Sequence, residues 1–114
     1  MESCVFCKIV ANQLPHHRIY QDELLTAFED RSPIAPIHIL IVPNQHLESL
    51  NEANIEHKTL LGHMLITAQQ LAKQLQLANA GYRLVINTGP DAGQSVYHLH
   101  LHLLGGRKLS FSAQ

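Results

Sequence analysis

The stretch that decides the fold is Val96-Tyr97-His98-Leu99-His100-Leu101-His102-Leu103-Leu104, which Gly105 and Gly106 follow. Histidine and leucine alternate through its middle, and strict alternation of polar and apolar residues predicts a β-strand. Because residues two apart share a face of a strand, the three histidines line one side and the leucines between them line the other. We expect the leucine side to pack on a helix and the histidine side to present a row of imidazoles.

This imidazole row admits three interpretations. A solvent-facing half of an amphipathic strand is ordinary for one histidine but unusual for three in register. A metal centre built on all three is disfavoured, because the positions span ~13–14 Å and zinc–nitrogen bonds are ~2.0–2.1 Å; one of them could still bind a metal with residues from elsewhere. Reaction with an anionic substrate fits best, since a neutral imidazole attacks and a protonated one holds negative oxygens.

The loop before this strand supports an anionic substrate. It reads Gly89-Pro90-Asp91-Ala92-Gly93-Gln94-Ser95, which brings backbone N–H groups and one hydroxyl next to the first histidine. Glycine allows the backbone to approach a phosphate closely. Tight turns also use glycine for structural reasons alone, so glycine by itself does not indicate a phosphate site. The position of the loop beside the imidazoles is what favours phosphate binding.

The rest of the chain predicts an α+β domain. Apolar residues recur at helical spacing over Leu60–Leu77, and Asn79-Ala80-Gly81 then offers a residue suited to a left-handed helix cap. A short helix is expected over Val5–Ala11, and strands are expected at Arg18–Tyr20, Leu25–Glu29, Ile37–Val42, Tyr82–Asn87 and Val96–Leu104. A mostly antiparallel sheet of about five strands follows, because these strands accompany one long helix.

The composition fits a single domain, residues 1–114, and excludes several classes of protein. The chain has 8 Lys+Arg against 9 Asp+Glu, so it lacks the basic excess of a nucleic-acid-binding protein. No apolar run approaches the ~18 residues of a membrane span, and no signal peptide is recognised, so we expect a cytoplasmic protein with no membrane partner. Charged residues make up 15%, against the usual ~25%. Either Gln, Asn and His side chains keep the surface soluble, or a second subunit covers part of it.

Taken together, these motifs resemble those of the histidine triad (HIT) family. The family's His-x-His-x-His motif followed by two apolar residues stands here as residues 98–104, and the resemblance is closest to the Hint branch, the nucleoside phosphoramidases. The resemblance implies the HIT-like fold and a homodimer whose sheet continues across both subunits. It extends over nearly the whole chain, through Cys4-Val5-Phe6-Cys7-Lys8-Ile9, Phe28-Glu29-Asp30, Ser32-Pro33, Ala35-Pro36-Ile37-His38, Val42-Pro43, Val85-Ile86-Asn87, Gly93-Gln94-Ser95-Val96-Tyr97-His98 and Gly105-Gly106-Arg107.

The resemblance implies hydrolysis of a purine nucleoside 5′-phosphoramidate, a substrate of the AMP-amine type, with no cofactor required for catalysis. By that likeness His100 attacks the α-phosphorus and forms a nucleotidyl-histidine intermediate, which water hydrolyses. His102 and His38 would hold phosphate oxygens, and His98 would orient the row. Asp30 would bind the ribose, the purine pocket would comprise Phe6, Ile9, Phe28 and Ile39, and the phosphate and leaving-group side would comprise Asn87, Gly93, Gln94, Ser95 and Val96.

The chemistry also needs an acid near the nucleophile, because a phosphoramidate nitrogen leaves well when it is protonated. Positioned proton transfer contributes ~10²–10⁴ in rate, and either Ser95 or a neighbouring histidine can supply that proton. For His100 to attack, one ring nitrogen must be free. We therefore expect the other nitrogen to donate to a fixed acceptor such as a backbone carbonyl.

Several of these residues also admit a purely structural interpretation. Asp30 precedes Ser32-Pro33 and can cap a turn, and Asn87 ends a predicted strand, where Asn often forms turns. His38 lies in an apolar strand and can be a hydrogen-bonded core residue. The remaining histidines outside the motifs are expected on the surface or on a helix face, namely His16, His17, His57 and His63.

Cys4 and Cys7 form a C-x₂-C pair, a spacing common in zinc half-sites. Two small buried hydrophobes are the structural alternative, and a redox pair is disfavoured because no thioredoxin-like strand precedes it. The resemblance to a zinc-binding subset of HIT proteins implies a structural zinc held by Cys4, Cys7, His46 and His98. With His98 as a ligand, catalysis would fall more heavily on the other two triad histidines and His38.

The chain departs from the family pattern at its C-terminus. Close Hint relatives often carry a tryptophan there that reaches the partner's site, whereas this chain has none and Phe111 stands roughly in its place. Leaving-group preference is therefore open. Two other functions also stay open: a dinucleoside polyphosphate hydrolase, against which Gly93-Gln94-Ser95 speaks, and a nucleotide- or zinc-binding regulatory protein with vestigial catalysis.

Overall fold

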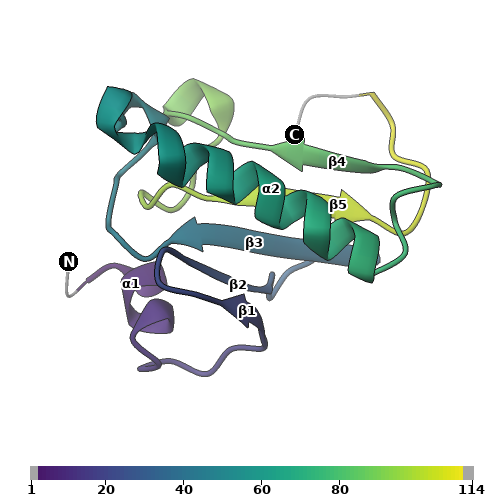
Figure 1. The fold of residues 1–114 in the computed structure, drawn as a ribbon, viewed down its shortest axis with the longest axis horizontal. Coiled ribbons are helices and arrows are strands. Elements are labelled where there is room, and N and C mark those ends of the chain that lie inside the picture. Colours follow the sequence, from purple (N-terminus) through teal and green to yellow (C-terminus); the bar gives the residue numbers. More distant parts are fainter. Residues whose placement is uncertain (1–2, 112–114) are drawn as a thin grey trace.

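The computed structural model describes residues 3–111, and in that part of the chain the strands form a single sheet in the order β1-β2-β3-β5-β4. Each neighbouring pair is antiparallel, as Figure 1 shows. The predicted α+β class with an antiparallel sheet is thereby confirmed. The strands are β1 (Arg18–Gln21), β2 (Leu25–Glu29), β3 (Ile37–Pro43), β4 (Tyr82–Val85) and β5 (Leu101–Gly105).

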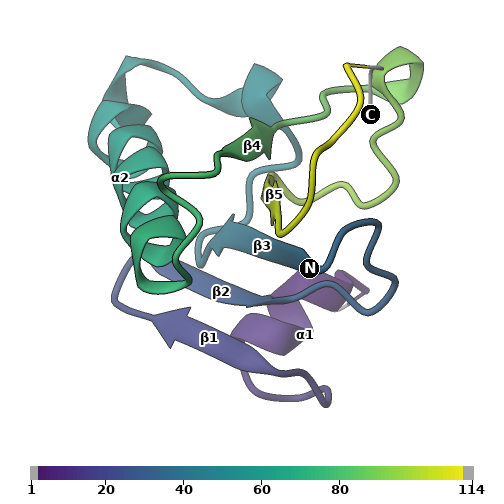
Figure 2. The same cartoon turned by 90° about the vertical axis from the view of Figure 1, so that its right-hand side faces the viewer.

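The helices α1 and α2 lie on opposite faces of the sheet. The long helix α2 (Lys58–Gln74) covers one face, and the short α1 (Val5–Val10) packs against the other, as the turned view in Figure 2 shows. Within the described residues, no helix is long and apolar enough to cross a membrane. Short turns of 3₁₀-helix complete the fold at η1 (Leu50–Glu52), η2 (Ile55–His57) and η3 (Pro90–Ala92).

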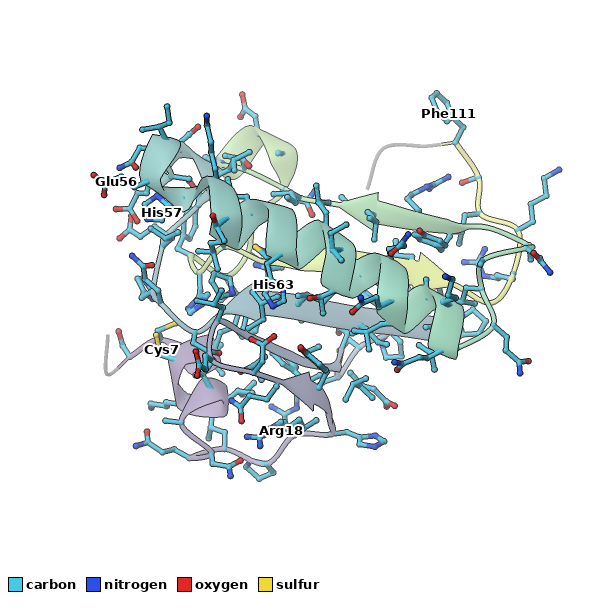
Figure 3. The ribbon with its side chains drawn as sticks, viewed as in Figure 1. Cys7, Arg18, Glu56, His57, His63 and Phe111 are labelled. Carbon is cyan, nitrogen blue, oxygen red and sulfur yellow. The ribbon has the colours of Figure 1, made fainter. Side chains whose placement is uncertain are left out.

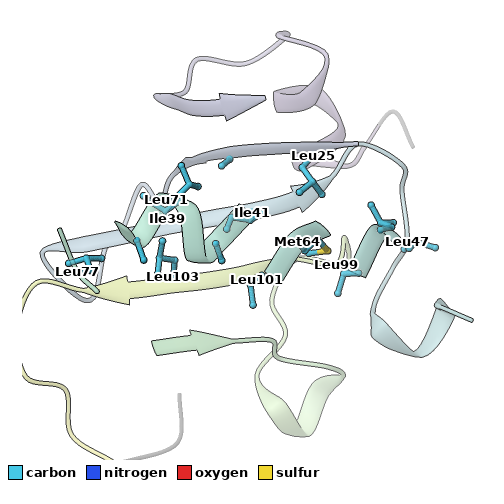
Figure 4. Close-up of a cluster of buried hydrophobic side chains, with 14 residues drawn as sticks. Leu25, Ile39, Ile41, Leu47, Met64, Leu71, Leu77, Leu99, Leu101 and Leu103 are labelled. Carbon is cyan, nitrogen blue, oxygen red and sulfur yellow. The ribbon is translucent and has the colours of Figure 1, made fainter. Parts of the chain in front are cut away.

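The alternation of side chains along β3 and β5 divides the sheet into two unlike faces. Ile39 and Ile41 belong to the same buried cluster as Leu101 and Leu103, beneath α2, as Figure 4 shows. Leu40 belongs to the opposite cluster against α1, and its backbone partner is His102. The expected separation of a leucine face from an imidazole face is therefore confirmed.

The strand that carries the imidazoles starts later than predicted, because β5 begins at Leu101 rather than Val96. Its ladder with β3 stops where Ile41 pairs with Leu101. Pro43, at the end of β3, has no N–H to donate, and its carbonyl accepts a hydrogen bond from Nε2 of His98 at 2.8 Å. The chain thus leaves the ladder before Leu101 while its side chains keep their alternating directions.

The ends of two other elements also differ from the prediction. The helix stops at Gln74 rather than Leu77, because Gln76 adopts the left-handed conformation (φ 62°) that was expected within Asn79-Ala80-Gly81. The N–H groups of Gln76 and Leu77 donate to carbonyls of the last turn at 3.1 and 2.8 Å, the pattern that terminates many helices. The strand β4 ends at Val85 rather than Asn87.

The half-buried carboxylate of Asp22 ties α2 to the turn between β1 and β2. His63, labelled on α2 in Figure 3, donates from Nε2 to Asp22 at 2.6 Å, and the Tyr20 hydroxyl donates to the same oxygen at 2.5 Å. The backbone N–H groups of Leu24 and Leu25 donate to the other oxygen. Burial acts to raise the pKa of Asp22, but these hydrogen bonds outweigh it and hold the pKa well below its usual range.

This arrangement predicts an acid-sensitive contribution to stability. Asp22→Asn should lower the free energy of unfolding at neutral pH by about 2 kcal/mol, because the hydrogen bonds to a charged acceptor are lost. Since the folded-state pKa is depressed, the stabilisation is present above the unfolded-state pKa of ~3.9 and disappears as the pH falls below it. The difference between variant and wild type should therefore shrink toward about pH 3.

Chemical denaturation at about pH 7 and about pH 3 measures both effects. Glu23→Gln is the matched control, because Glu23 is an exposed acid of the same turn. A difference between Asp22→Asn and wild type that stays constant with pH would contradict the assignment.

Candidate active site

The structure brings two histidines of the imidazole row together with His38 and Asp30. The ring centroids of His100 and His102 lie 5.0 Å apart, and those of His102 and His38 lie 5.2 Å apart. His98 is fully buried, and its ring belongs to a different cluster, described below. The row is therefore split between two places on the same face of the sheet.

The ring of His100 has one nitrogen engaged and one available. Nδ1 donates to the carbonyl oxygen of His98 at 2.7 Å, so the proton of the neutral ring sits on Nδ1 and the lone pair sits on Nε2. The backbone carbonyl predicted as a fixed acceptor is thus present. Burial lowers the pKa of His100, against the hydrogen bond to His98 and the charge of Asp30, which raise it. The neutral, nucleophilic form is therefore favoured.

The tautomers of His38 and His102 follow from a chain of hydrogen bonds. The N–H of Ile34 donates to Nδ1 of His38 at 3.2 Å, which places the proton of the neutral ring on Nε2. That Nε2 lies 2.9 Å from Nδ1 of His102, which therefore accepts. The remaining nitrogen of His102, Nε2, then carries a proton that it can donate to a negative oxygen.

These rings are held in the neutral form by burial. Burial, helped by the neighbouring rings of His100 and His38, lowers the pKa of His102 to about 4. Burial also lowers the pKa of His38, although the nearby charge of Asp30 raises it. At neutral pH the site is built from uncharged imidazoles and one carboxylate.

Asp30 caps a turn and also borders the cavity. One carboxylate oxygen accepts from the N–H of Ser32 at 2.7 Å, which caps the turn, and the other lies 3.4 Å from Nε2 of His38. The side chain also lines the cavity beside the histidines. A turn-capping role therefore holds the carboxylate at the edge of the site.

A cavity of about 390 Å³ opens beside these rings, a volume within the usual range for small-molecule sites. Phe6 and Phe28 form its aromatic wall, with ring centroids 5.4 Å apart, and Ile9 continues that wall. His100 and His102 also line the cavity. The sequence-predicted pocket residues Phe6, Ile9 and Phe28 are thus brought together.

Ile39 is the exception, and its prediction as a pocket residue is wrong. It points to the other face of β3 and packs beneath α2, whereas its neighbour Leu40 lines the cavity. The period of two in a strand explains the difference, because a residue adjacent to His38 must face away from it. Leu40, two residues after His38, could have been identified by that rule.

A second cavity of about 340 Å³ also borders His102 and is lined in part by Asp30, His38, Asn87 and Ser95. Ser95 lines both cavities, as do Asp30 and His102. Val96 lines the first cavity. Three of the residues predicted for the phosphate and leaving-group side, Asn87, Ser95 and Val96, therefore border the site.

Gly93 and Gln94 line neither cavity, which corrects their predicted placement. Gln94 is buried, and its amide nitrogen donates to the carbonyls of Glu48 and Val96 at 2.8 and 3.0 Å. Its amide oxygen accepts from the N–H of Gly89 at 2.9 Å. Gly93 ends η3 in the left-handed region (φ 80°) that favours glycine. Both residues shape the loop that carries Ser95.

The other end of the row contributes to a four-residue cluster of potential metal ligands. One donor atom from each residue lies within 4.8 Å of the others in the set Cys4, Cys7, His46 and His98. The sulfur–nitrogen separations of 3.2, 3.3 and 3.6 Å lie within a few tenths of an ångström of the roughly 3.5 Å that zinc bond lengths and a tetrahedral angle imply.

The chemistry of the donors agrees with this geometry. His98 donates from Nε2 to Pro43, which leaves the lone pair of Nδ1 facing both cysteines. Burial and the adjacent Cys4 raise the pKa of Cys7 to about 11. A cation is the partner that would favour the thiolate form here. The donor set thus fits the implied zinc.

Asp30, His38 and His102 form a second group with metal-ligand spacing, but its hydrogen bonds do not fit a metal. Nδ1 of His38 already accepts from the N–H of Ile34, so the neutral ring has a proton, not a lone pair, at Nε2. This group is better described as a hydrogen-bonded relay.

Of the four histidines expected outside the site, one lies within it. His16 lines the 390 Å³ cavity and packs edge-on to Phe28 at 6.2 Å between centroids. His17 pairs with Glu29 on the surface, His57 caps η2, and His63 holds Asp22. No periodicity or motif marks His16, because it lies in the irregular segment between α1 and β1.

A family model and similar known sequences both identify the HIT domain in this chain. A family model described as "HIT domain" matches residues 11–109. The purine nucleoside phosphoramidase of Escherichia coli (strain K12) is 48% identical over 108 residues, which cover 95% of this chain and 91% of that protein. An uncharacterized HIT-like protein of Synechococcus elongatus is 51% identical over 110 residues, 96% of either chain.

Solved structures agree with the fold. A HIT family hydrolase from Legionella pneumophila Philadelphia 1 superposes with a TM-score of 0.96 at 42% identity, over 98% of this chain and 100% of that one. A Zn-bound histidine triad family protein from Mycobacterium smegmatis superposes with a TM-score of 0.85 at 34% identity, over 99% and 84% of the two chains.

Proposed function

Because the chain belongs to the HIT domain family, we propose that its imidazole row is the active centre of a hydrolase that cleaves purine nucleoside 5′-phosphoramidates. The observation that carries the proposal is the 2.7 Å hydrogen bond from Nδ1 of His100 to the carbonyl of His98. It leaves a neutral imidazole with a free lone pair beside a cavity of nucleotide-compatible size. The name of the E. coli relative supports the choice of substrate class.

In the first step, Nε2 of His100 attacks the α-phosphorus. The phosphorus–nitrogen bond of the substrate breaks as the new bond to Nε2 forms, and the amine leaves after it has gained a proton. His102, with a proton on Nε2, donates to a phosphate oxygen, and the hydrogen bond from His38 to His102 keeps that ring in the required tautomer. His98 positions the nucleophile through its carbonyl rather than through its ring.

Ser95 would relay a proton from solvent to the leaving nitrogen. It lines both cavities, one of which would hold the nucleotide and the other the leaving group. In the second step, water attacks the phosphorus and releases a proton to solvent, the bond to Nε2 breaks, and the nucleoside 5′-monophosphate leaves. His100 regains its lone pair for the next turnover.

The nucleoside would occupy the apolar cavity. The purine would lie against Phe6, Ile9 and Phe28, where flat apolar surfaces suit a ring system. Asp30, fixed by the N–H of Ser32, would accept from the ribose hydroxyls. Asn87 would border the leaving group in the second cavity.

The nucleophile assignment predicts that His100→Ala lowers kcat by at least roughly 10³-fold, as the loss of a nucleophile does. Nucleotide affinity should change little, because the cavity walls remain. Steady-state kinetics on adenosine 5′-monophosphoramidate and calorimetry with AMP measure the two effects. Full activity in His100→Ala would refute the assignment.

Trapping the covalent intermediate identifies the attacking residue directly. Rapid acid quench of wild type with labelled substrate should place the nucleotidyl group on the peptide that contains His100. His17→Ala, which alters an exposed histidine, is the matched control and should trap as wild type does. Faster turnover of a dinucleoside polyphosphate than of the phosphoramidate would favour the alternative hydrolase activity.

We also propose that Cys4, Cys7, His46 and His98 hold a structural zinc, which would fix α1 and His98 in place. The tetrahedral spacing of the donors and the Zn-bound relative from M. smegmatis support it. Bound there, zinc supplies a rigid tetrahedral anchor for four side chains and no reacting group.

Protein purified without chelator should contain about one zinc per chain. Cys7→Ser should lose most of the metal and melt at a lower temperature, because metal-binding energy contributes to folding. Elemental analysis and thermal denaturation provide the two measurements. Substoichiometric zinc in fully active wild type would count against the site.

The exposed surface supports a homodimer. β4 is an edge strand whose residues are half-buried in the single chain, so a second copy can continue the sheet there. Leu65 and Ile66 of α2 are 50% and 53% exposed, which is typical of an apolar surface awaiting a partner.

Sedimentation should therefore give twice the chain mass of 12.8 kDa. The double variant Leu65→Glu and Ile66→Glu should shift the equilibrium toward monomer, because it buries charges in the interface. Leu24→Glu is the control, since Leu24 is 43% exposed in the turn between β1 and β2, at the other edge of the sheet. A monomeric wild type would exclude the dimer.

A further inference from the structure

The apolar wall of the proposed purine cavity is buried, whereas its rim is exposed. Phe6, Ile9 and Phe28 form the wall, and each is at most 7% exposed. Glu29 and Arg31 line the same cavity and are exposed residues. A flat base that lay against the wall would turn its other face toward this rim.

Arg31 places a permanent positive charge on the rim, and the acidic residues before it in the chain are engaged elsewhere. Asp30 accepts from the N–H of Ser32 at 2.7 Å and lies 3.4 Å from Nε2 of His38. Glu29 pairs with His17 at 3.0 Å. Within residues 3–111, Arg31 forms no ion pair with either carboxylate.

Arg31 also differs from the other arginines of the chain in its hydrogen bonding. Each of the other guanidinium groups donates to a fixed oxygen, in the pairs Arg18 with Asn12 at 3.1 Å, Arg83 with Ser110 at 2.6 Å and Arg107 with Ile34 at 2.9 Å. Arg31 has no hydrogen-bond partner in the part of the chain that the structure describes. Its guanidinium is therefore available to a ligand that enters the cavity.

The face of a base is the part of a nucleotide that suits this guanidinium. Arginine is planar and weakly hydrated and stacks on aromatic faces, and proteins hold unpaired bases against arginine planes in this way. Asp30 and His102 line both cavities, near where the phosphate would react, whereas Arg31 lines only the first cavity, as Phe6 and Phe28 do. The position of Arg31 thus favours the base over the phosphate.

We propose that Arg31 is a base-binding residue, whose guanidinium stacks on the face of the purine that the apolar wall leaves uncovered. This inference rests on the proposed function and deepens it, because it assigns a second contact to the base. The purine would lie between apolar side chains and a cation. Since adenine and guanine both have a π face, the contact strengthens binding without selecting between them.

Calorimetry with AMP, adenosine and ribose 5-phosphate separates contact with the base from attraction to the phosphate. Arg31→Ala should weaken the binding of AMP and of adenosine by about fivefold, the size of a partly exposed cation–π contact. The affinity for ribose 5-phosphate, which has no base, should not change. GMP should lose affinity by the same factor as AMP, because the contact is to the face of the ring.

Arg18→Ala is the matched control, because Arg18 is an exposed arginine that does not line the cavity. It should bind all four ligands as wild type does. A loss in Arg31→Ala that AMP and ribose 5-phosphate share and adenosine lacks would show attraction to the phosphate and overturn the proposal. Unchanged affinities, or a loss for only one of AMP and GMP, would overturn it as well. If wild type binds none of the four, the proposed function itself fails.

Discussion

The structure depends on one geometric constraint, the alternation of side chains along two paired central strands. β3 and β5 lie next to each other in the sheet, so a residue on one strand and its partner on the other point to the same side. Ile39 and Leu103 thereby enter the core beneath α2, while Leu40 and His102 face α1. The same register that buries the apolar residues assembles the polar site, so neither can be shifted without the other.

His98 connects two parts of the molecule through different atoms. Its Nδ1 faces the cysteines of the metal-ligand cluster, its Nε2 donates to Pro43, and its carbonyl accepts from His100. The irregular backbone before β5 leaves the His98 carbonyl free of the ladder, so that it can accept from His100. The interruption of the strand thus fixes the ring of the proposed nucleophile.

Patterns with a fixed period were predictable, and local exceptions were not. The sheet, the helix α2 and the shared face of the triad follow from periods of two and 3.6 residues. His100 as the proposed nucleophile, His38 and the four-residue metal-ligand cluster were located by resemblance, and hydrogen bonds in the structure then assign the tautomers of the histidines among them. Gln76 takes the left-handed conformation although glycine stands nearby, because packing decides where the helix ends. Gln94 was expected to line the site but is buried and lines neither cavity, whereas His16 was expected outside the site but lines the first cavity. Both residues lie in irregular segments, whose geometry has no periodicity from which it could be predicted.

The shortness of α1 has a consequence for ligand binding. Its six residues carry both Phe6 and Ile9, which wall the cavity, and Cys7 of the metal-ligand cluster, with Cys4 as its cap. So short a helix has little stability of its own. Whatever binds Cys4 and Cys7 therefore also fixes the cavity wall that α1 forms. By thermodynamic reciprocity, a nucleotide bound against that wall would in turn strengthen the binding at the cysteines.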